Sequence, residues 1–193
     1  MIQYADVDPF IRCYPDMIDA ALCQAMIQKF DADPRRQAGR VLAYNAAGIK
    51  ESVDLEIRVL PDWEPLCRAF DRSVARSLRR YRTDVPNFNE TQRGMFRETG
   101  YQIQCYQPNG RDSFLWHSDV SSRPSCDRVL ALIAYLNTVE VGGETEFRAQ
   151  ELKIAPARGS ILWFPPTFPY VHRGNVPLSG PKYIVTCFLT YPK

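Results

Sequence analysis

The run "VLALIAYLN", residues 129–137, decides the fold class of this sequence. It is apolar over nearly its whole length, and a short apolar run between turns is typical of a strand buried on both faces. Shorter strand-like segments, separated by turns such as "PNGRD", surround it. These segments read "YQIQCY", "FLWHSD", "VGGETEF", "GSILWF" and "KYIVTCFLTY". Many short strands with turns rich in glycine and proline predict a β-sandwich or barrel from about residue 101 onward.

Two helices are predicted in the first half, so we expect a mainly β fold with N-terminal helices. "PDMIDAALCQAMIQKF" and "DWEPLCRAFDRSVARSLRRYR" both repeat apolar residues at helical spacing. The second helix should begin with an Asp62 cap and have Pro65 in its first turn. The expected buried stripes are Ile18, Leu22, Ala25, Met26 and Phe30 in the first helix, and Leu66, Phe70, Val74, Leu78 and Tyr81 in the second.

The opposite face of the second helix carries a row of arginines, namely Arg68, Arg72, Arg76 and Arg79. Such a row is most often a solvated outer face, and we favour this interpretation. A surface for an acidic substrate or a nucleic-acid backbone is the alternative. The net charge of +2 is too small to argue for a polyanionic partner, so nucleic acid is not the expected ligand.

Length and composition indicate one soluble globular domain covering residues 1–193. The sequence is 45% hydrophobic and 24% charged, without repeats or low-complexity tracts. It contains no apolar run long enough to cross a bilayer, and its N-terminus lacks the pattern of a secretory signal. None of the six cysteines forms a C-x-x-C pair, which favours reduced thiols over a zinc motif. We therefore expect a cytoplasmic protein, whose oligomeric state the sequence leaves open.

Residues able to bind a metal are concentrated in "FLWHSDV", residues 114–120. The chain has two histidines, and His117 stands two residues before Asp119. Side chains two apart on a strand point to the same side, so His117 and Asp119 should face one way. With His172, in "YVHRG", they would form the facial set of two histidines and one carboxylate found in non-haem Fe(II) oxygenases. A single strand histidine is more often a hydrogen-bonded structural residue, and that alternative stays open for each of them.

Two amides share a strand face in "YQIQCY". Gln102, Gln104 and Tyr106 alternate with apolar residues, so all three should lie on one face. A pair of glutamines is unusual in a pure core. If this face is the interior, Gln102 and Gln104 would line the substrate pocket and help to select the substrate.

From Tyr101 to Tyr191 the sequence resembles the prolyl-4-hydroxylase-like branch of the Fe(II)/2-oxoglutarate-dependent dioxygenases. The matching pieces are "YQIQCYQPNG", "WHSD", "VLALIAYLN", "GGETEF", "IAPARGSILWFPP", "VHRG" and "SGPKYIVTCFLTY", in that order. The resemblance covers roughly the C-terminal half and depends on the agreement of all the pieces. It implies a double-stranded β-helix, a cupin-like jelly roll, as the catalytic core over residues 96–193, with residues 1–95 as a helical support region.

The resemblance also implies roles for individual residues. His117, Asp119 and His172 would hold Fe(II), with 2-oxoglutarate and O2 as cosubstrates and ascorbate as a possible reductant. Lys182 would pair with the far carboxylate of 2-oxoglutarate. Its position at the start of an otherwise apolar strand supports this role, because a buried ammonium requires an anionic partner. The alternative is a charge at the exposed end of the strand.

Three further residues, Tyr106, Tyr135 and Thr186, would contact the cosubstrate. Thr186 lies four residues after Lys182 on the same strand face. The two tyrosines could equally be core residues with satisfied hydroxyls.

The function implied by the resemblance is hydroxylation of an unactivated C–H bond. A prolyl residue in a peptide or protein is the expected substrate. A free amino acid or other small molecule is the alternative, and a jelly-roll binding module without activity is a third. The carboxylate of Asp119 argues against halogenation, because family members that halogenate lack it. The arginine repeat of nucleic-acid demethylases is missing after His172.

Overall fold

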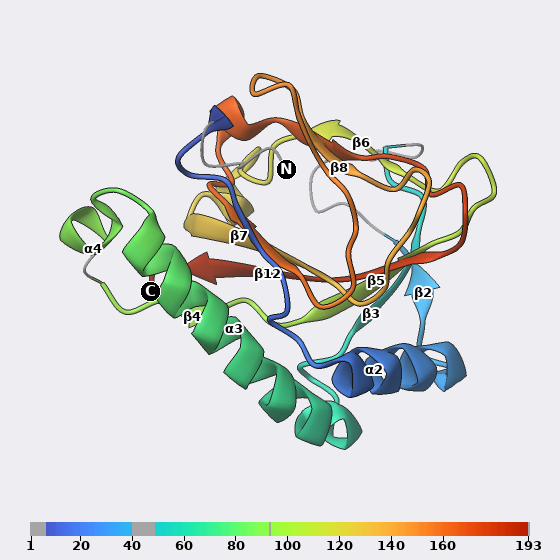
Figure 1. Cartoon of the computed structure of the whole chain (residues 1–193). Coiled ribbons are helices and arrows are strands. Elements are labelled where there is room, and N and C mark those ends of the chain that lie inside the picture. The colour runs from blue at the N-terminus through green and yellow to red at the C-terminus, as the bar shows by residue number, and fades with distance from the viewer. Residues whose placement is uncertain (1–6, 40–48, 93, 193) are drawn as a thin grey trace.

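Two antiparallel sheets form most of the protein, as a computed structural model of residues 7–39, 49–92 and 94–192 shows (Figure 1). Within these residues the larger sheet has eight strands, with the order β1-β10-β7-β12-β5-β3-β2 and with β4 paired to β12. Its strands are β1 (Arg12–Tyr14), β2 (Gln37–Ala38), β3 (Val53–Glu56), β4 (Arg97–Glu98), β5 (Gln102–Tyr106), β7 (Arg128–Tyr135), β10 (Ile161–Phe164) and β12 (Lys182–Thr190). The smaller sheet has the order β6-β11-β8-β9. It consists of β6 (Phe114–His117), β8 (Thr145–Phe147), β9 (Leu152–Ile154) and β11 (His172–Gly174). The predicted mainly β fold is confirmed.

The apolar run at residues 129–137 contains all of β7 except its first residue, Arg128, and β7 lies between β10 and β12 inside the larger sheet. Its alternate residues belong to two different clusters of buried side chains. Leu130, Leu132 and Ala134 belong to the outer cluster, which also contains helix residues. Ala131 and Ile133 belong to the inner cluster, which faces the smaller sheet. The predicted strand buried on both faces is confirmed, and its lack of hydrophobic alternation follows from having apolar neighbours on either side.

Helices α2 (Ala20–Ala32) and α3 (Glu64–Asp84) cover the outer face of the larger sheet (Figure 1). Phe30 of α2 packs edge-on against Tyr183 of β12, with ring centroids 6.0 Å apart. Phe70 of α3 meets Tyr101 in the same way at 4.9 Å. The predicted helical stripes therefore pack against the sheet, except that Ile18, although buried, precedes the start of α2 at Ala20.

The predicted helix cap at Asp62 is wrong. The helix α3 begins at Glu64, and Asp62 lies in the 3-10 turn Pro61–Trp63 that precedes it. The carboxylate of Asp62 instead accepts hydrogen bonds from Arg35, at 3.0 and 2.9 Å. Local sequence favoured a cap, but a guanidinium from a distant segment forms the charged and stronger hydrogen bonds. Pro65 occupies the first turn, as predicted.

The first half of the chain contributes strands as well as helices. β1 pairs with β10, and β3 pairs with β5, so both extend the larger sheet. The prediction of a helical support region over residues 1–95 did not anticipate these strands. A short helix, α4 (Phe88–Thr91), and the 3-10 turns Arg123–Ser125 and Phe168–Tyr170 complete the elements. Among the described residues, none of the helices combines the length and apolar character needed to cross a membrane.

Candidate metal centre

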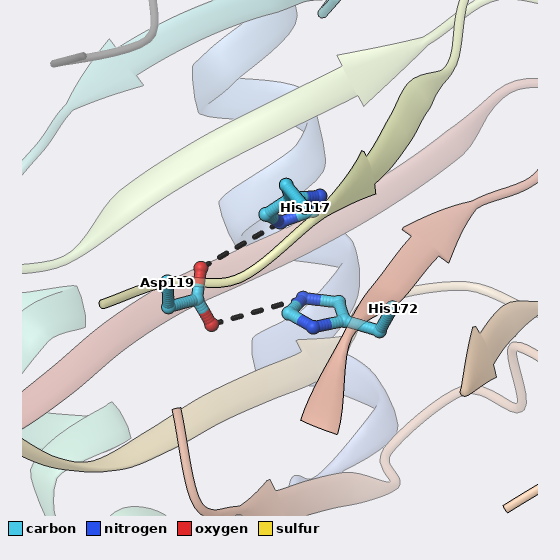
Figure 2. A group of neighbouring side chains, drawn as sticks. All are labelled: His117, Asp119 and His172. Atoms are coloured by element: carbon cyan, nitrogen blue, oxygen red, sulfur yellow. Dashed lines mark ion pairs between the residues drawn. The ribbon is translucent and has the colours of Figure 1, made fainter. Parts of the chain in front are cut away.

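His117 and His172 lie opposite each other on the antiparallel strands β6 and β11. Their ring centroids are 4.2 Å apart, and the carboxylate of Asp119 lies beside the two rings with one oxygen directed toward each (Figure 2). One carboxylate oxygen is 3.6 Å from Nε2 of His117, and the other is 3.7 Å from Nε2 of His172. One ligand atom from each residue fits within 4.8 Å of the other two. The structure thus brings together three residues that are predicted to hold a metal.

Asp119 takes its position in a way that the strand pattern did not predict. Strand β6 ends at His117, and Asp119 lies in a bend beyond it. The carbonyl oxygen of Pro166 holds this bend, accepting hydrogen bonds from Ser118 Oγ and from Val120 N, both at 3.0 Å. The predicted convergence of His117 and Asp119 is correct, but the bend, with its contact to a distant loop, produces it.

Both imidazoles are oriented by backbone carbonyls. Nδ1 of His117 lies 2.7 Å from the oxygen of Leu115, and Nδ1 of His172 lies 3.0 Å from the oxygen of Tyr170. A proton on each Nδ1 satisfies these contacts and leaves the Nε2 lone pair directed toward Asp119. Carbonyl contacts of this kind fix the tautomer of histidines that ligate metals.

The charges of the site suit a divalent cation. Burial, helped by the nearby His117, lowers the pKa of His172 to about 4, so its imidazole is neutral at pH 7. Burial tends to raise the pKa of Asp119, but His172 and His117 outweigh it and the net pKa is lowered. Two imidazoles and one carboxylate form a nitrogen and oxygen donor set, which suits Fe(II).

Aromatic side chains of the inner cluster hold the imidazole rings in place. Phe114 stacks on His117 with centroids 3.5 Å apart and planes 9° from parallel. Phe164 meets His172 edge-on at 4.7 Å, and Phe147 lies 5.6 Å from it. Rings packed in this way have little freedom to turn away from a metal.

Lys182 is buried inside the barrel, at 2% exposure, so the alternative of an exposed charge is wrong. Its Nζ donates a hydrogen bond to the oxygen of Gly143 at 3.0 Å and lies 4.7 Å from the ring centroid of Tyr106. Burial lowers the pKa of Lys182 to about 8, against a smaller opposing effect of Glu144. Within the described residues no carboxylate forms an ion pair with this ammonium, which therefore keeps donors for an anion.

The other predicted site residues share the inner face with Lys182. Tyr106 lies opposite Lys182 in the strand register, and Gln102 lies opposite Thr186. Tyr135 on β7 has its hydroxyl 2.7 Å from Thr145 Oγ1. The predicted common face of Gln102, Gln104 and Tyr106 is confirmed, since the three side chains are joined by hydrogen bonds.

Arg128 was missed by sequence reasoning. Its Nη1 donates to the carbonyl oxygen of Asp119 at 2.8 Å, and its guanidinium carbon lies 3.6 Å from the ring centroid of Phe188. Arg128 therefore braces the bend that presents the carboxylate. The signal that could have found it is the one used for Lys182, a cation at the start of an otherwise apolar strand.

A barrel of two sheets that gathers two histidines and one carboxylate in its interior defines a candidate mononuclear metal enzyme. The comparison with protein families gives the class. Residues 101–190 match the 2OG-Fe(II) oxygenase superfamily, and this segment includes the three candidate ligands and Lys182. The segment that contains the candidate site therefore matches a 2OG-Fe(II) oxygenase domain. The family implies Fe(II), 2-oxoglutarate and O2, and the donor set described above fits Fe(II).

Solved structures with the same fold include several prolyl hydroxylases. A prolyl hydroxylase from Trichoplax adhaerens, in complex with a hypoxia inducible factor oxygen degradation domain peptide fragment, aligns with a TM-score of 0.76 at 16% identity, over 99% of this chain and 88% of that one. The viral collagen prolyl hydroxylase of Paramecium bursaria Chlorella virus-1 aligns with 0.70 at 16% identity, over 96% and 98%. A Pseudomonas putida prolyl-4-hydroxylase aligns with 0.67 at 14% identity, over 98% and 97%. At these identities the likeness shows the fold. No curated protein sequence matches the chain.

Proposed function

We propose that the protein is an Fe(II)- and 2-oxoglutarate-dependent dioxygenase that hydroxylates a prolyl residue in a peptide or protein. The observation that carries this proposal is the convergence of His117, Asp119 and His172 inside a 2OG-Fe(II) oxygenase domain. These three side chains would hold Fe(II). Together with 2-oxoglutarate and O2, the bound metal supplies the oxidising power for hydroxylation of an unactivated C–H bond.

The protein itself supplies binding and orientation. The ammonium of Lys182 would pair with the far carboxylate of 2-oxoglutarate, because it is buried and has only the oxygen of Gly143 as a hydrogen-bond partner among the described residues. Tyr106 lies against the same ammonium, and Tyr135 and Thr186 lie on neighbouring strands of the inner face. The hydroxyls of Tyr135 and Thr186 would complete the hydrogen bonds of the cosubstrate, whereas the hydroxyl of Tyr106 donates to Gln104.

The choice of a peptidyl substrate is supported by the solved structures of the same fold. Three of them are prolyl hydroxylases, and one contains a peptide fragment of hypoxia inducible factor. A free amino acid or another small molecule is the rival substrate class, and a binding module without activity is the rival function.

Anaerobic titration with Fe(II) and 2-oxoglutarate tests the metal and cosubstrate. We expect a weak visible metal-to-ligand charge-transfer band that saturates with 2-oxoglutarate and is missing in a His172→Ala variant. A folded protein that stays colourless at saturating Fe(II) and 2-oxoglutarate would contradict the proposal and favour the binding module.

Succinate release tests the substrate class. We expect a library of proline-containing peptides to stimulate succinate formation well above the level without substrate. Equal or greater stimulation by free proline would contradict the peptidyl preference while leaving the oxygenase activity intact.

A further inference from the structure

The inner face of β5 carries a chain of hydrogen bonds that leads away from Lys182. The hydroxyl of Tyr106 donates to Oε1 of Gln104 at 2.7 Å. Nε2 of Gln104 donates to Oε1 of Gln102 at 2.7 Å and to Oγ1 of Thr186 at 3.1 Å. The amide of Gln104 is thus held in one orientation by its neighbours.

The hydroxyl of Tyr106 sets the donor-to-acceptor direction of these hydrogen bonds. A phenol hydroxyl has a single hydrogen to donate, and buried Tyr106 gives it to Gln104. The carbonyl of Gln104 must then face Tyr106, and its amino group must face Gln102. Gln102 in turn presents its carbonyl oxygen to Gln104, which turns its own amino group away from the chain.

The amino group of Gln102 is the free end. None of the residues that the structure describes accepts a hydrogen bond from Nε2 of Gln102, whereas Gln104 uses both ends of its amide. Gln102 is also only half-buried, while Gln104 is 6% exposed. A network built only to stabilise a core would satisfy its last donor inside the protein.

The free end lies toward the Asp119 side of the barrel. Strand register sets Tyr106 opposite Lys182 and Gln102 opposite Thr186, so the chain runs along β12 away from the lysine. Phe188 lies two residues beyond Thr186 on the same face of β12. The guanidinium of Arg128 covers Phe188 and donates to the carbonyl oxygen of Asp119. The cosubstrate cation and the free amide therefore mark opposite ends of one face.

We propose that Gln102 positions the peptide substrate by donating a hydrogen bond from Nε2 to a backbone carbonyl oxygen next to the target residue. Gln104 and Tyr106 hold the amide of Gln102 with its donors outward. This inference rests on the proposed function and deepens it by naming the group of the substrate that is recognised. It also separates the two ends of the inner face, with Lys182 serving the cosubstrate and Gln102 the peptide.

Gln102→Glu is the direct test, because glutamate has the same shape but offers only acceptors. We expect KM for a proline-containing peptide to rise about tenfold, the effect of one lost hydrogen bond with unpaired acceptors left behind. The affinity for 2-oxoglutarate, read from the charge-transfer band, should stay within about twofold, and kcat should change less than KM. A uniformly structural role for Gln102 would lower kcat, cosubstrate affinity and thermal stability together.

Gln104→Glu is a second test that leaves Gln102 untouched. A carboxylate at position 104 still accepts from Tyr106, but it also accepts from the amino group of Gln102 and so turns the oxygen of Gln102 outward. We expect KM for the peptide to rise as in Gln102→Glu. Gln107→Glu is the matched control, because it makes the same change of charge at an exposed residue next to the strand, outside the chain of hydrogen bonds.

The outcomes separate this inference from the proposed function. If peptides drive succinate release in the wild type and KM in Gln102→Glu matches that of Gln107→Glu, the assignment of Gln102 is overturned and the proposed function stands. If the wild type forms the charge-transfer band but no peptide stimulates succinate release, the peptidyl substrate and the role of Gln102 both fail.

Discussion

The two faces of the larger sheet are both buried, yet they differ in what they bury. The outer face packs apolar side chains against α2 and α3, and its buried indole nitrogen, Trp163 Nε1, donates to Ser77 Oγ at 3.0 Å. The inner face buries the ammonium of Lys182 with only a carbonyl oxygen as its hydrogen-bond partner among the described residues. Burial alone therefore does not separate core from site.

The difference has an energetic meaning. Apolar burial on the outer face stabilises the fold, by about 25 cal/mol for each Å² removed from water. An unpaired buried charge on the inner face lowers the stability of the protein. Such a charge is typical of a binding site, where a ligand supplies the missing partner. The comparison predicts that outer substitutions change stability and inner substitutions change ligand binding.

Loss of the Asp119 carboxylate, which faces both histidines, should have the largest effect. In Asp119→Ala we expect peptide-dependent succinate release to fall more than about 1,000-fold, since even residues that only orient a metal ligand cost about 10–100-fold. Bound iron per chain should fall in parallel. Asp127→Ala removes a carboxylate outside the cluster and should retain activity. Equal activity in the two variants would contradict the assignment of the inner face as the site.

A substitution on the outer face should lower stability and leave cosubstrate binding unchanged. Phe70→Ala empties a fully buried position between α3 and Tyr101 and should lower the free energy of unfolding by about 3–5 kcal/mol. The charge-transfer band of the folded fraction should keep its position and its 2-oxoglutarate affinity. Denaturant titration measures the first effect, with exposed Val59→Ala as a control expected within about 0.5 kcal/mol of wild type. A large loss of cosubstrate affinity in folded Phe70→Ala would break the comparison.

The cost of the buried ammonium should appear as a pH dependence of stability. The pKa of Lys182 is about 8 in the folded protein, below the ordinary lysine value of 10.5, so between these values the unfolded chain binds more protons. Stability without 2-oxoglutarate should therefore rise with pH across this window, by up to about 3 kcal/mol relative to Lys182→Met. Unfolding titrations of both proteins from about pH 7 to pH 10.5 measure it. If the free energies of unfolding of the two proteins change equally with pH, burial does not destabilise the charged form of Lys182.

The same lysine should matter for the cosubstrate. Lys182→Met removes one partner of a buried charge pair and should weaken 2-oxoglutarate binding by tens-fold or more, as expected from about 2–5 kcal/mol for such pairs. The fold should be spared, because the variant also removes a desolvated charge. Titration of the charge-transfer band measures the affinity, and Lys153→Met, at an exposed residue, is the control. Unchanged affinity in Lys182→Met would remove it from the cosubstrate site.

Strand periodicity and residue counts were enough to predict the faces and the candidate ligands. Alternation placed Gln102, Gln104 and Tyr106 together, and with only two histidines in the chain the second imidazole had to be His172. The common face of Gln102, Gln104 and Tyr106 depends only on local strand geometry, whereas His117 and His172 meet through the pairing of β6 with β11.

Features that depend on distant contacts could not be predicted. The bend that presents Asp119 is held by a hydrogen bond to the carbonyl oxygen of Pro166. Asp62 binds the guanidinium of Arg35 instead of capping a helix. The unsatisfied end of Gln102 becomes visible only when the partners of Gln104 are known. The first two cases each involve a hydrogen bond between residues that are far apart in the sequence.

The arginine face of α3 lies outside both faces of the sheet, and substitutions there should have the smallest effects. Arg76 donates to the carbonyl oxygen of Met17 at 2.6 Å, so Arg76→Ala should cost about 1 kcal/mol. Exposed Arg79 has no such contact among the described residues, and Arg79→Ala should stay within about 0.5 kcal/mol. Neither variant should change peptide-dependent succinate release, because a solvated face far from the inner cluster has no substrate to bind. A severalfold rise in KM in both variants would restore the alternative of an acidic substrate surface along this helix.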